Sequence, residues 1–282
     1  MNKSLSITIV CCNDQRIFKC IESIQKNDFF GLEFEIIVIL VPNEAIKNKL
    51  KDIKGIKIAF AEKGNLSQSR NIGIKYSKYP LILFLDSDLI LERNYLKKMI
   101  HVAKEDVIVK SNIEFKSDNF LSSVIAKSRK IGHLEKPYAP GIIISKKLFE
   151  KFGLFDENIF FSEDGELITR FQKNGISTLW VNDAIIFHPP ISLKHDLMIA
   201  FKIGQGKRIG VEIGKLENEE DFKEFFKKML KGAQVMYFAK IWEKWGLVVA
   251  IYEIIWYIFY YFGYYEKKYV KKKCFSYFST SR

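Results

Sequence analysis

The chain has 282 residues, enough for one large α/β domain with a sizeable core or for one domain with a smaller appendage. Its residues are 48% hydrophobic and 15% aromatic, which excludes a disordered protein. The formal net charge of +12 is compatible with phosphorylated substrates or an anionic membrane surface. Nucleic acid is not expected as a partner, because no zinc-finger, RNP or helix-turn-helix motif accompanies the basic residues.

The four cysteines indicate a reduced compartment. Cys11 and Cys12 are adjacent, Cys20 falls in a predicted helix and Cys274 lies near the end, so no C-x-x-C pair is present. Residues 1–12 are too short and too rich in β-formers for a secretory signal. We expect a cytoplasmic protein without disulfides or a zinc site.

Apolar segments of strand length alternate with amphipathic helical patterns over the first half of the chain. This alternation predicts an α/β fold with a doubly wound, mostly parallel sheet flanked by helices. The predicted strands are residues 5–11, 35–41, 56–60, 81–85 and 107–113, and the predicted helices include residues 17–24, 66–73 and 96–103. In such sheets ligands bind beyond the carboxyl ends of the strands, near the point where strand order reverses.

After residue 115 the pattern becomes less regular. A break at 137–141 is followed by a predicted strand (142–144), a short helix (146–152), a helix opened by Ser162 as N-cap (163–173) and two edge strands (177–181 and 184–187). Pro189 and Pro190 then mark a boundary. The sequence therefore predicts a catalytic domain over 1–190, with halves of about 1–115 and 116–190, and a helical region over 191–282.

The C-terminal region is rich in lysine and aromatic residues. One predicted helix over 222–236 has an apolar face opposite a lysine face, and residues 246–265 are almost wholly apolar apart from Glu253. That length just reaches a bilayer span, but Glu253 would be costly at the bilayer centre. We expect a peripheral helix at the cytoplasmic membrane face, with packing on the catalytic domain or on another subunit as the alternative.

Two carboxylates follow the apolar segment 81–85. In an extended backbone Asp86 and Asp88 would point to one side and Ser87 to the other. Two hard oxygen donors at one point fit Mg²⁺ or Mn²⁺, which proteins commonly hold through carboxylates together with substrate phosphate oxygens. The pair thus indicates a nucleoside-diphosphate site; the alternative is a strand that runs into an acidic turn.

Several further segments occur in a definite order around this pair. Their order and spacing resemble a family-2 glycosyltransferase of the GT-A fold over most of residues 4–188. The segments that carry the resemblance are the opening strand, loop and helix (Ile7 to Ile24), the Ser-Arg-Asn-Ile-Gly run (Ser69 to Gly73), Asp86-Ser87-Asp88, Gly141, the Phe-Gly-Leu-Phe-Asp turn (Phe152 to Asp156) and Ser162-Glu163-Asp164.

The resemblance implies an inverting, metal-assisted transfer of a sugar from a nucleoside-diphosphate donor to a hydroxyl on a glycan or lipid-linked glycan. It implies Asp164 as catalytic base beside Glu163, and Asp86, Asp88 and His188 as ligands of Mn²⁺ or Mg²⁺. The positions that it places at the nucleotide sugar are Cys12, Asn13, Arg16, Asn43, Asn65, Arg70, Asp86, Ser87 and Gly141.

Each of these residues also has a structural explanation. Glu163 and Asp164 would lie in the first helical turn, where the helix dipole favours acidic residues. Arg70 could be a surface arginine, His188 a turn residue and Gly141 a plain turn glycine. Relatives usually carry an aspartate where this chain has Asn43, and the asparagine amide leaves the preference among uridine, guanosine and thymidine open.

Two rival functions remain at this point. A haloacid-dehalogenase-type phosphatase also uses an Asp-x-Asp pair, but it needs the pair after the first strand and a Thr or Val where this chain has Ile90. A degenerate, membrane-tethered binder of nucleotide sugars would keep the donor motifs without turnover. Slow hydrolysis of the donor with Mn²⁺ separates an active transferase from such a binder.

Overall fold

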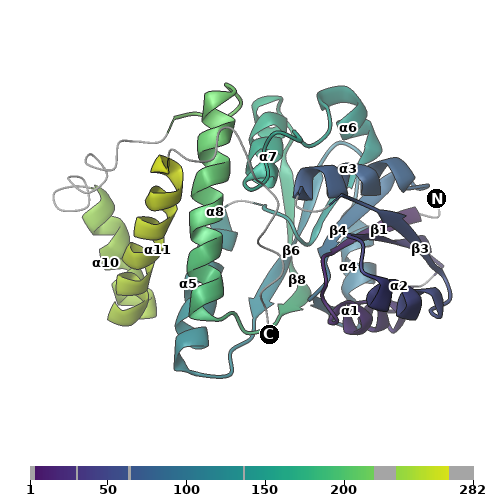
Figure 1. Cartoon of the computed structure of the whole chain (residues 1–282), viewed down its shortest axis with the longest axis horizontal. Coiled ribbons are helices and arrows are strands. Elements are labelled where there is room, and N and C mark those ends of the chain that lie inside the picture. Colours follow the sequence, from purple (N-terminus) through teal and green to yellow (C-terminus); the bar gives the residue numbers. More distant parts are fainter. Residues whose placement is uncertain (1–3, 30, 63–64, 136, 219–232, 267–282) are drawn as a thin grey trace. The chain divides into compact units, whose positions relative to one another are not determined.

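In the part of the chain that the structure describes, eight strands form one sheet in the order β3-β2-β1-β4-β7-β6-β8-β5. Figure 1 labels β1, β3, β4, β6 and β8 of this sheet. The computed structural model describes residues 4–29, 31–62, 65–135, 137–218 and 233–266. The strands are β1 (Ser4–Cys11), β2 (Glu33–Leu40), β3 (Ile56–Phe60), β4 (Leu81–Asp86), β5 (Ile90–Leu91), β6 (Ile108–Phe115), β7 (Ile142–Ser145) and β8 (Thr178–His188). The strands β3, β2, β1 and β4 are parallel, while β7 is antiparallel to β4 and to β6. The predicted fold class, a mostly parallel sheet with flanking helices, is confirmed.

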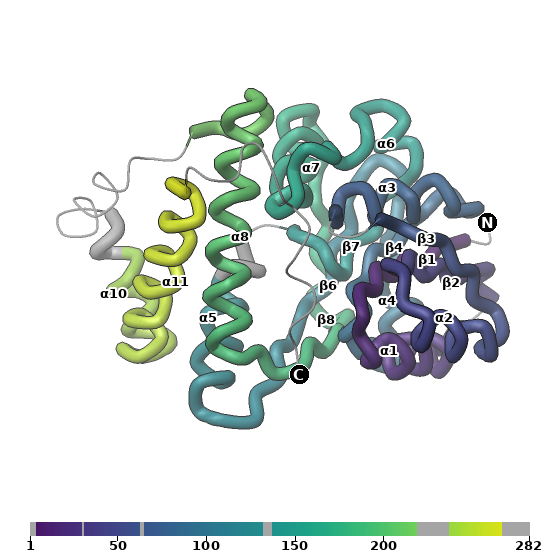
Figure 2. The backbone as a smooth tube through the Cα atoms, in the orientation of Figure 1, coloured from purple at the N-terminus to yellow at the C-terminus, as the bar shows by residue number. Residues whose placement is uncertain are grey.

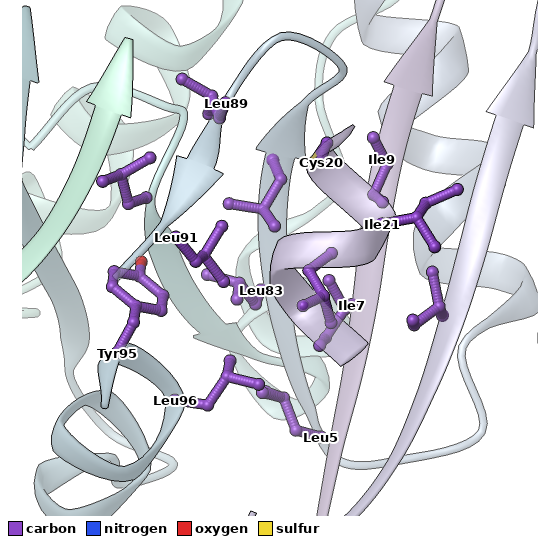
Figure 3. Close-up of a cluster of buried hydrophobic side chains, with 14 of the residues drawn as sticks. Leu5, Ile7, Ile9, Cys20, Ile21, Leu83, Leu89, Leu91, Tyr95 and Leu96 are labelled. Atoms are coloured by element: carbon purple, nitrogen blue, oxygen red, sulfur yellow. The ribbon is translucent and has the colours of Figure 1, made fainter. Parts of the chain in front are cut away.

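Helices cover both faces of this sheet. The helices α1 (Ile17–Gln25), α2 (Glu44–Lys51) and α4 (Tyr95–Val102) lie on one face, and α3 (Leu66–Tyr76), α6 (Lys146–Phe152) and α7 (Glu163–Lys173) lie on the other (Figure 2). The two cores use alternate residues of the same strands, because successive side chains of a strand point to opposite faces. Figure 3 shows the first core, where Ile21 of α1 and Leu96 of α4 meet residues of β1 and β4.

Two local predictions were wrong. The edge strands expected at 177–181 and 184–187 form one continuous strand, β8, because the polar residues Asn182 and Asp183 are exposed positions of that strand and not a turn. Ser162 does precede α7, but it has a left-handed backbone with φ of 67° and makes no side-chain capping bond to the helix. The sequence analysis also did not predict α2 or β5.

The chain divides into two compact units. One, here called the sheet unit, contains residues up to 114 together with 136–189; the other, the helical unit, contains 115–135 together with 190–272. The helices described in the helical unit are α5 (Phe120–Glu135), α8 (Leu193–Glu212), α10 (Ala233–Trp245) and α11 (Leu247–Tyr265). The sequence-based division had placed residues 116–135 in the catalytic half. They group instead with the helical unit because Val124 and Ile125 of α5 join its aromatic core.

Helices α8 and α11 approach closely within the helical unit. A Cβ on Gly204 of α8 would lie 1.9 Å from the Tyr260 carbonyl oxygen, and one on Gly263 of α11 would lie 1.9 Å from that of Phe201. Only glycine allows backbones to meet in this way. The predicted helix over 222–236 falls almost entirely outside the described residues.

Candidate active site

The carboxyl ends of three parallel strands meet at one edge of the sheet. Val10 of β1 pairs with Asp86 of β4, and Cys11 pairs with Leu40 of β2. The loops after β1, β2 and β4 therefore start side by side, as the sequence analysis expected for a cleft at strand ends. Cys12, which directly follows β1, is partly exposed.

The loops after β1 and β2 are joined by two asparagines. The Asn43 side chain caps α2 by accepting from the Ile46 backbone N–H at 3.0 Å, and its amide nitrogen donates to Asn13 Oδ1 at 2.6 Å. Asn13 itself has a left-handed backbone, with φ of 52°, a conformation that asparagine tolerates well. The Asn43 oxygen and one of its amide hydrogens are thus engaged, which leaves one amide hydrogen for a nucleotide base.

Asp14 and Arg16 connect the first loop to the end of β4. Arg16 makes a bidentate contact with Asp14, at 2.8 Å for the closest pair, and its Nη2 lies 3.3 Å from Asp88 Oδ2. Ser87 Oγ lies 3.4 Å from Asp14 Oδ2. Burial alone would raise the pKa of Asp14, but hydrogen bonds from Arg16 outweigh burial and lower it. The structure therefore brings the predicted residues Arg16, Ser87 and Asp88 together around a carboxylate that the sequence analysis missed.

The backbone around the acidic pair differs from the expected extended strand. β4 ends at Asp86, and Ser87 and Asp88 form a turn in which the Leu89 N–H lies 3.5 Å from the Asp86 carbonyl. The alternation argument therefore does not apply to Asp88. Instead the two carboxylates face different arginine side chains: Asp86 Oδ1 is 4.0 Å from Arg70 Nη2, while Asp88 faces Arg16.

His188 at the end of β8 lies close to Asp88. Its Nε2 is 3.7 Å from Asp88 Oδ2, and its Nδ1 is 2.8 Å from the Pro189 carbonyl oxygen. Because a carbonyl oxygen only accepts, Nδ1 carries the hydrogen of this bond, and Nε2 is the ring nitrogen that faces Asp88. Histidines that bind metals usually have this second contact. The two carboxylates fit Mn²⁺ or Mg²⁺, which prefer oxygen ligands, whereas the imidazole suits a transition metal such as Mn²⁺ better than Mg²⁺.

Within the described residues, however, no group of three or more His, Cys, Asp or Glu side chains is gathered closely enough to hold a metal ion. A cation at Asp86, Asp88 and His188 would thus need side-chain adjustment or oxygen atoms from a substrate. Substrate phosphates supply such oxygens in many Mg²⁺ sites.

Arg70 links the donor side of the site to α7. It is 4% exposed, forms an ion pair and hydrogen bond with Glu163, and lies 4.0 Å from Asp86. Glu163 is 3% exposed. Burial raises the pKa of Glu163, and the Arg70 guanidinium opposes that rise. Arg70 is therefore a buried bridge and not a surface arginine, and the Glu163 carboxylate is occupied by it.

The run around Arg70 also fixes the loop that precedes α7. Asn65 caps α3 and donates to the Glu157 carbonyl oxygen at 2.8 Å, and Ser67 donates to that of Ile159 at 2.5 Å. Asn71 bonds both the N–H and the carbonyl of Phe155 at 3.0 Å. Asn65, which was predicted to lie at the nucleotide sugar, thus stabilises the protein's own structure. Together with Ser67 and Asn71 it positions the segment that leads to the candidate base.

Of the neighbouring carboxylates Glu163 and Asp164, Glu163 is buried and Asp164 remains partly exposed. Its Oδ1 accepts from the Gly165 N–H at 2.8 Å. Burial raises its pKa, whereas Arg70, the Gly165 and Ala139 N–H groups and Lys110 limit the rise. A carboxylate with a raised pKa that can still ionise is well suited to accept a proton near neutral pH.

Gly141 has a structural requirement for glycine. Its φ is 78°, and an added Cβ would lie 2.5 Å from Ser111 Oγ and 2.8 Å from Ile186 Cδ1. Its N–H bonds the Phe84 carbonyl at 2.8 Å, which aligns β7 with β4. The close approach that requires glycine here is between strands of the protein, whether or not a sugar also lies near.

The comparisons with known proteins agree with this geometry. The model described as "Glycosyl transferase family 2" matches residues 6–160, more than half of the chain. The chain belongs to glycosyl transferase family 2. The matched range contains the acidic pair and the Arg70 motif but ends before Glu163, Asp164 and His188, so the assignment of those three residues rests on the geometry above.

Two curated relatives in this family differ in the sugars that their names give. Poly(ribitol-phosphate) beta-N-acetylglucosaminyltransferase TarP of Staphylococcus aureus (strain N315) is 28% identical over 125 residues, which are 41% of this chain and 38% of that protein. The dTDP-rhamnosyl transferase RfbF of Shigella flexneri is 25% identical over 175 residues, 55% of this chain and 59% of that one. The chain thus covers less than two thirds of either relative.

Solved structures show the same fold. S. aureus TarS 1-349 in complex with UDP-GlcNAc has a TM-score of 0.54 and 17% sequence identity, covering 84% of this chain and 76% of that chain. The structure of TarS 1-349 in complex with UDP has a TM-score of 0.51 and covers 83% of this chain. At this identity the likeness concerns the fold of the family-2 chain and not its substrate.

Proposed function

We propose that this chain is an inverting glycosyltransferase that moves a sugar from a nucleoside-diphosphate donor to an acceptor hydroxyl. The observation that carries the proposal is the position of Arg70, which pairs with Glu163, the neighbour of Asp164, and lies 4.0 Å from Asp86. The buried guanidinium of Arg70 thus connects the end of β4, which faces the donor, to the helix α7, which carries the base. A structural acidic turn would not need this connection.

The donor diphosphate would lie at the ends of β1 and β4, near Arg16, Ser87 and Asp88. Arginine binds phosphate oxygens bidentately, and Arg16 is held in place by Asp14. UDP sugars and dTDP sugars are the first donors to test, because the neighbour TarS was solved with UDP-GlcNAc and the name of RfbF specifies a dTDP-rhamnosyl transferase.

A divalent cation, Mn²⁺ or Mg²⁺, fits beside the diphosphate. Asp86 and Asp88 supply the carboxylate oxygens that such a cation prefers, and His188 would add a nitrogen ligand that favours Mn²⁺ over Mg²⁺. When bound, the cation would neutralise charge on the diphosphate as it leaves. The rest of the reaction depends on groups of the chain itself.

Asp164 would act as the base. It would accept the proton of the acceptor hydroxyl while that oxygen forms a bond to the anomeric carbon and the bond from that carbon to the diphosphate oxygen breaks. Glu163 cannot share this role while it pairs with Arg70, so we assign it to the positioning of Arg70. A single base with direct displacement gives inversion at the anomeric carbon.

The activity is tested by incubating the protein with Mn²⁺ and a panel of UDP, dTDP and GDP sugars and measuring released nucleoside diphosphate. An active transferase hydrolyses its own donor slowly without an acceptor, and chelation with EDTA stops the release. Donor binding without release from any sugar would instead identify a degenerate binder.

The acceptor side of the proposal involves a membrane, through the outer face of α11. In the part of the chain that the structure describes, this is the one helix long and apolar enough to cross a bilayer, with 19 residues and a mean hydropathy of 1.5. Five apolar residues at helical spacing are 36–57% exposed: Val248, Ile251, Ile255, Phe259 and Phe262, and Leu247 and Tyr265 at the two ends of the helix are exposed as well. A helix of a soluble protein normally exposes its polar face.

The polar groups of α11 lie on its inner face. Tyr252 donates to Asp196 Oδ2 at 2.6 Å, and Arg129 bonds the other oxygen of that carboxylate at 2.6 Å. Glu253 is also buried. The residue that argued against membrane contact in the sequence therefore faces the helical unit, and the outer face is free of charge.

We therefore propose that this face docks on an anionic bilayer at the cytoplasmic side and places the enzyme near a lipid-linked acceptor. The apolar surface continues onto α8, where a groove of about 340 Å³ is lined by Leu197, Met198, Phe201 and Phe259, with the exposed Lys194 beside it. Apolar contact with a bordering lysine fits anionic headgroups, as does the net charge of +12.

The double variant Ile255→Glu/Phe262→Glu is expected to lose most sedimentation with vesicles of phosphatidylcholine and phosphatidylglycerol, by about tenfold or more, because it puts two charges on the docking face. The matched control, Leu154→Glu/Leu179→Glu, replaces two exposed leucines of the sheet unit and should sediment like the unmodified protein. The membrane proposal is wrong if the unmodified protein does not sediment with the vesicles and is a dimer in solution while the double variant is a monomer. The face would then be a contact between two copies of the chain.

A further inference from the structure

Lys110 is a fully buried lysine near the candidate base. It lies in β6, has 0% exposure, and its Nζ donates to the carbonyl oxygens of Tyr138 at 2.7 Å and Pro140 at 2.6 Å. Lysine is almost never fully buried unless its charge has partners, because desolvation of an ammonium is costly. A methionine or leucine would fill the same space without that cost, so the ammonium needs an explanation.

The segment that Lys110 holds also packs at the start of α7. The carbonyls of Tyr138 and Pro140 accept from Lys110, and the backbone of Ala139 between them is one of the groups that limit the rise in the pKa of Asp164. Tyr138 also lies against the helix start, since a Cβ on Gly165 would be 3.4 Å from its ring. The position of Ala139 is therefore set by the bonds that Lys110 makes on either side.

We propose that Lys110 is a positioning residue for the base: its ammonium bonds the carbonyls on both sides of Ala139 and so holds the segment from Tyr138 to Pro140 against the start of α7, where Asp164 lies. This inference rests on the proposed function, in which Asp164 accepts the acceptor proton. Lys110 touches neither donor nor acceptor in this assignment and acts only through the segment and through its charge.

The charged groups around the pair determine the sign of the effect. Lys110 faces Asp164 and Asp86, and Asp164 faces Arg70 and Glu163 as well. Burial lowers the pKa of Lys110 to about 7, so the ammonium is present on the acidic side of neutrality. There it lowers the pKa of Asp164 and keeps the base ionised. A neutral amine above that pH still has two hydrogens for the two carbonyls.

The test is Lys110→Met, assayed for kcat and KM across pH 5 to 9 with the donor identified by the panel. At pH 6 we expect kcat to fall about 10- to 100-fold while the donor KM stays within about threefold, because the base is less ionised and less well placed. The acidic limb of the pH profile should move up by about one pH unit, as expected for loss of one nearby positive charge. The deficit should shrink toward pH 8.

Lys110→Gln and Lys104→Met complete the experiment. Glutamine keeps a hydrogen-bond donor for the carbonyls without the charge, so Lys110→Gln should show the pH shift with a smaller loss of kcat than Lys110→Met. It also replaces Lys110→Met in the test if that variant does not fold. Lys104 is an exposed lysine of the same unit, and its variant should behave like the unmodified protein. Folding is checked by the thermal shift that the nucleoside diphosphate of the identified donor produces with Mn²⁺.

An unmoved pH profile in folded Lys110 variants, with either unchanged kcat or a uniform loss, would overturn this inference. That outcome leaves the proposed function intact, because the unmodified protein would still turn over its donor. If the unmodified protein releases no nucleoside diphosphate from any sugar nucleotide, the proposed function itself fails, and the role of Lys110 fails with it.

Discussion

Replacement of Asp164 by Asn is expected to lower kcat by about 10²- to 10⁴-fold, the usual contribution of a general base. The amide has nearly the same shape and can still accept from the Gly165 N–H, but it cannot take a proton from the acceptor. Donor binding should remain nearly unchanged, since Arg16, Ser87 and Asp88 are untouched. Steady-state kinetics together with titration of the nucleoside diphosphate that the unmodified protein binds separates the two effects.

The matched control for this variant is Asp52→Asn, which makes the same chemical change at an exposed position after α2. It should retain full turnover. If Asp164→Asn also retains it, another group takes the proton and the assignment of the base is wrong. A loss of nucleoside-diphosphate binding in Asp164→Asn would indicate a structural role for the carboxylate instead.

The second large effect is expected for Arg70→Met, which leaves Glu163 buried without its counter-ion. Removing one member of a buried pair typically costs about 3–5 kcal/mol in the free energy of unfolding. Arg70 and Glu163 are 4% and 3% exposed, so solvent screens this pair little. Urea unfolding at pH 7 measures the loss, and kcat should fall as well because Arg70 also lies near Asp86.

The loss in Arg70→Met should depend on pH. Burial raises the pKa of Glu163 to about 8 even beside Arg70, and loss of the guanidinium raises it further. The folded variant therefore keeps its proton to higher pH than the unmodified protein, and stability is lost as pH rises because the unfolded chain has already ionised. The gap to the unmodified protein should change little below pH 7 and grow above about pH 8 by up to about 1.4 kcal/mol per pH unit.

The double variant Arg70→Met/Glu163→Met tests the cause of that loss. It removes both charges and should recover most of the stability at pH 7, because apolar side chains often replace a buried ion pair without cost. A double variant as unstable as Arg70→Met, or a gap that does not change with pH, would show that the packing of Arg70 and not the stranded carboxylate causes the loss.

The sequence predicted the part of the fold that depends on local pattern. The apolar segment 81–85 forms the buried strand β4, and the motif around Arg70 lies in α3. Both could be predicted because the periodicity of a strand or a helix depends on residues close together in the sequence. The acidic pair was recognisable for the same reason. Its backbone was not, since a turn that begins at Ser87 depends on contacts with the loop after β1.

The features that the sequence did not predict depend on residues far apart in the chain. Glu163 lies 93 positions from Arg70, and Lys110 lies about 30 from the carbonyls that it bonds. An aspartate after a strand, such as Asp14, has no distinctive spacing by itself. A lysine within a predicted strand reads as an exposed position, although Lys110 is fully buried.

The packing of the C-terminal helices also depends on residues far apart in the chain and was not predicted. The sequence of α11 contains enough apolar residues for a bilayer and one glutamate against it, but composition does not tell which face turns inward. Only packing against α8, through Gly204 and Gly263, fixes Glu253 inside and Phe262 outside. The grouping of α5 with these helices was missed because its partners lie far along the chain: Asp196 of α8 is 67 residues beyond Arg129, and the partners in α11 are further still.

Calorimetric titration with UDP, dTDP and GDP, each with Mn²⁺ or with EDTA, tests most directly whether the acidic pair after β4 holds the donor diphosphate. We expect at least one of these nucleotides to bind with Mn²⁺ and to bind at least about tenfold more weakly in EDTA or in the Asp88→Asn variant, because carboxylate ligands dominate such sites. Binding of none of the three, or binding that neither EDTA nor Asp88→Asn weakens, would contradict this role.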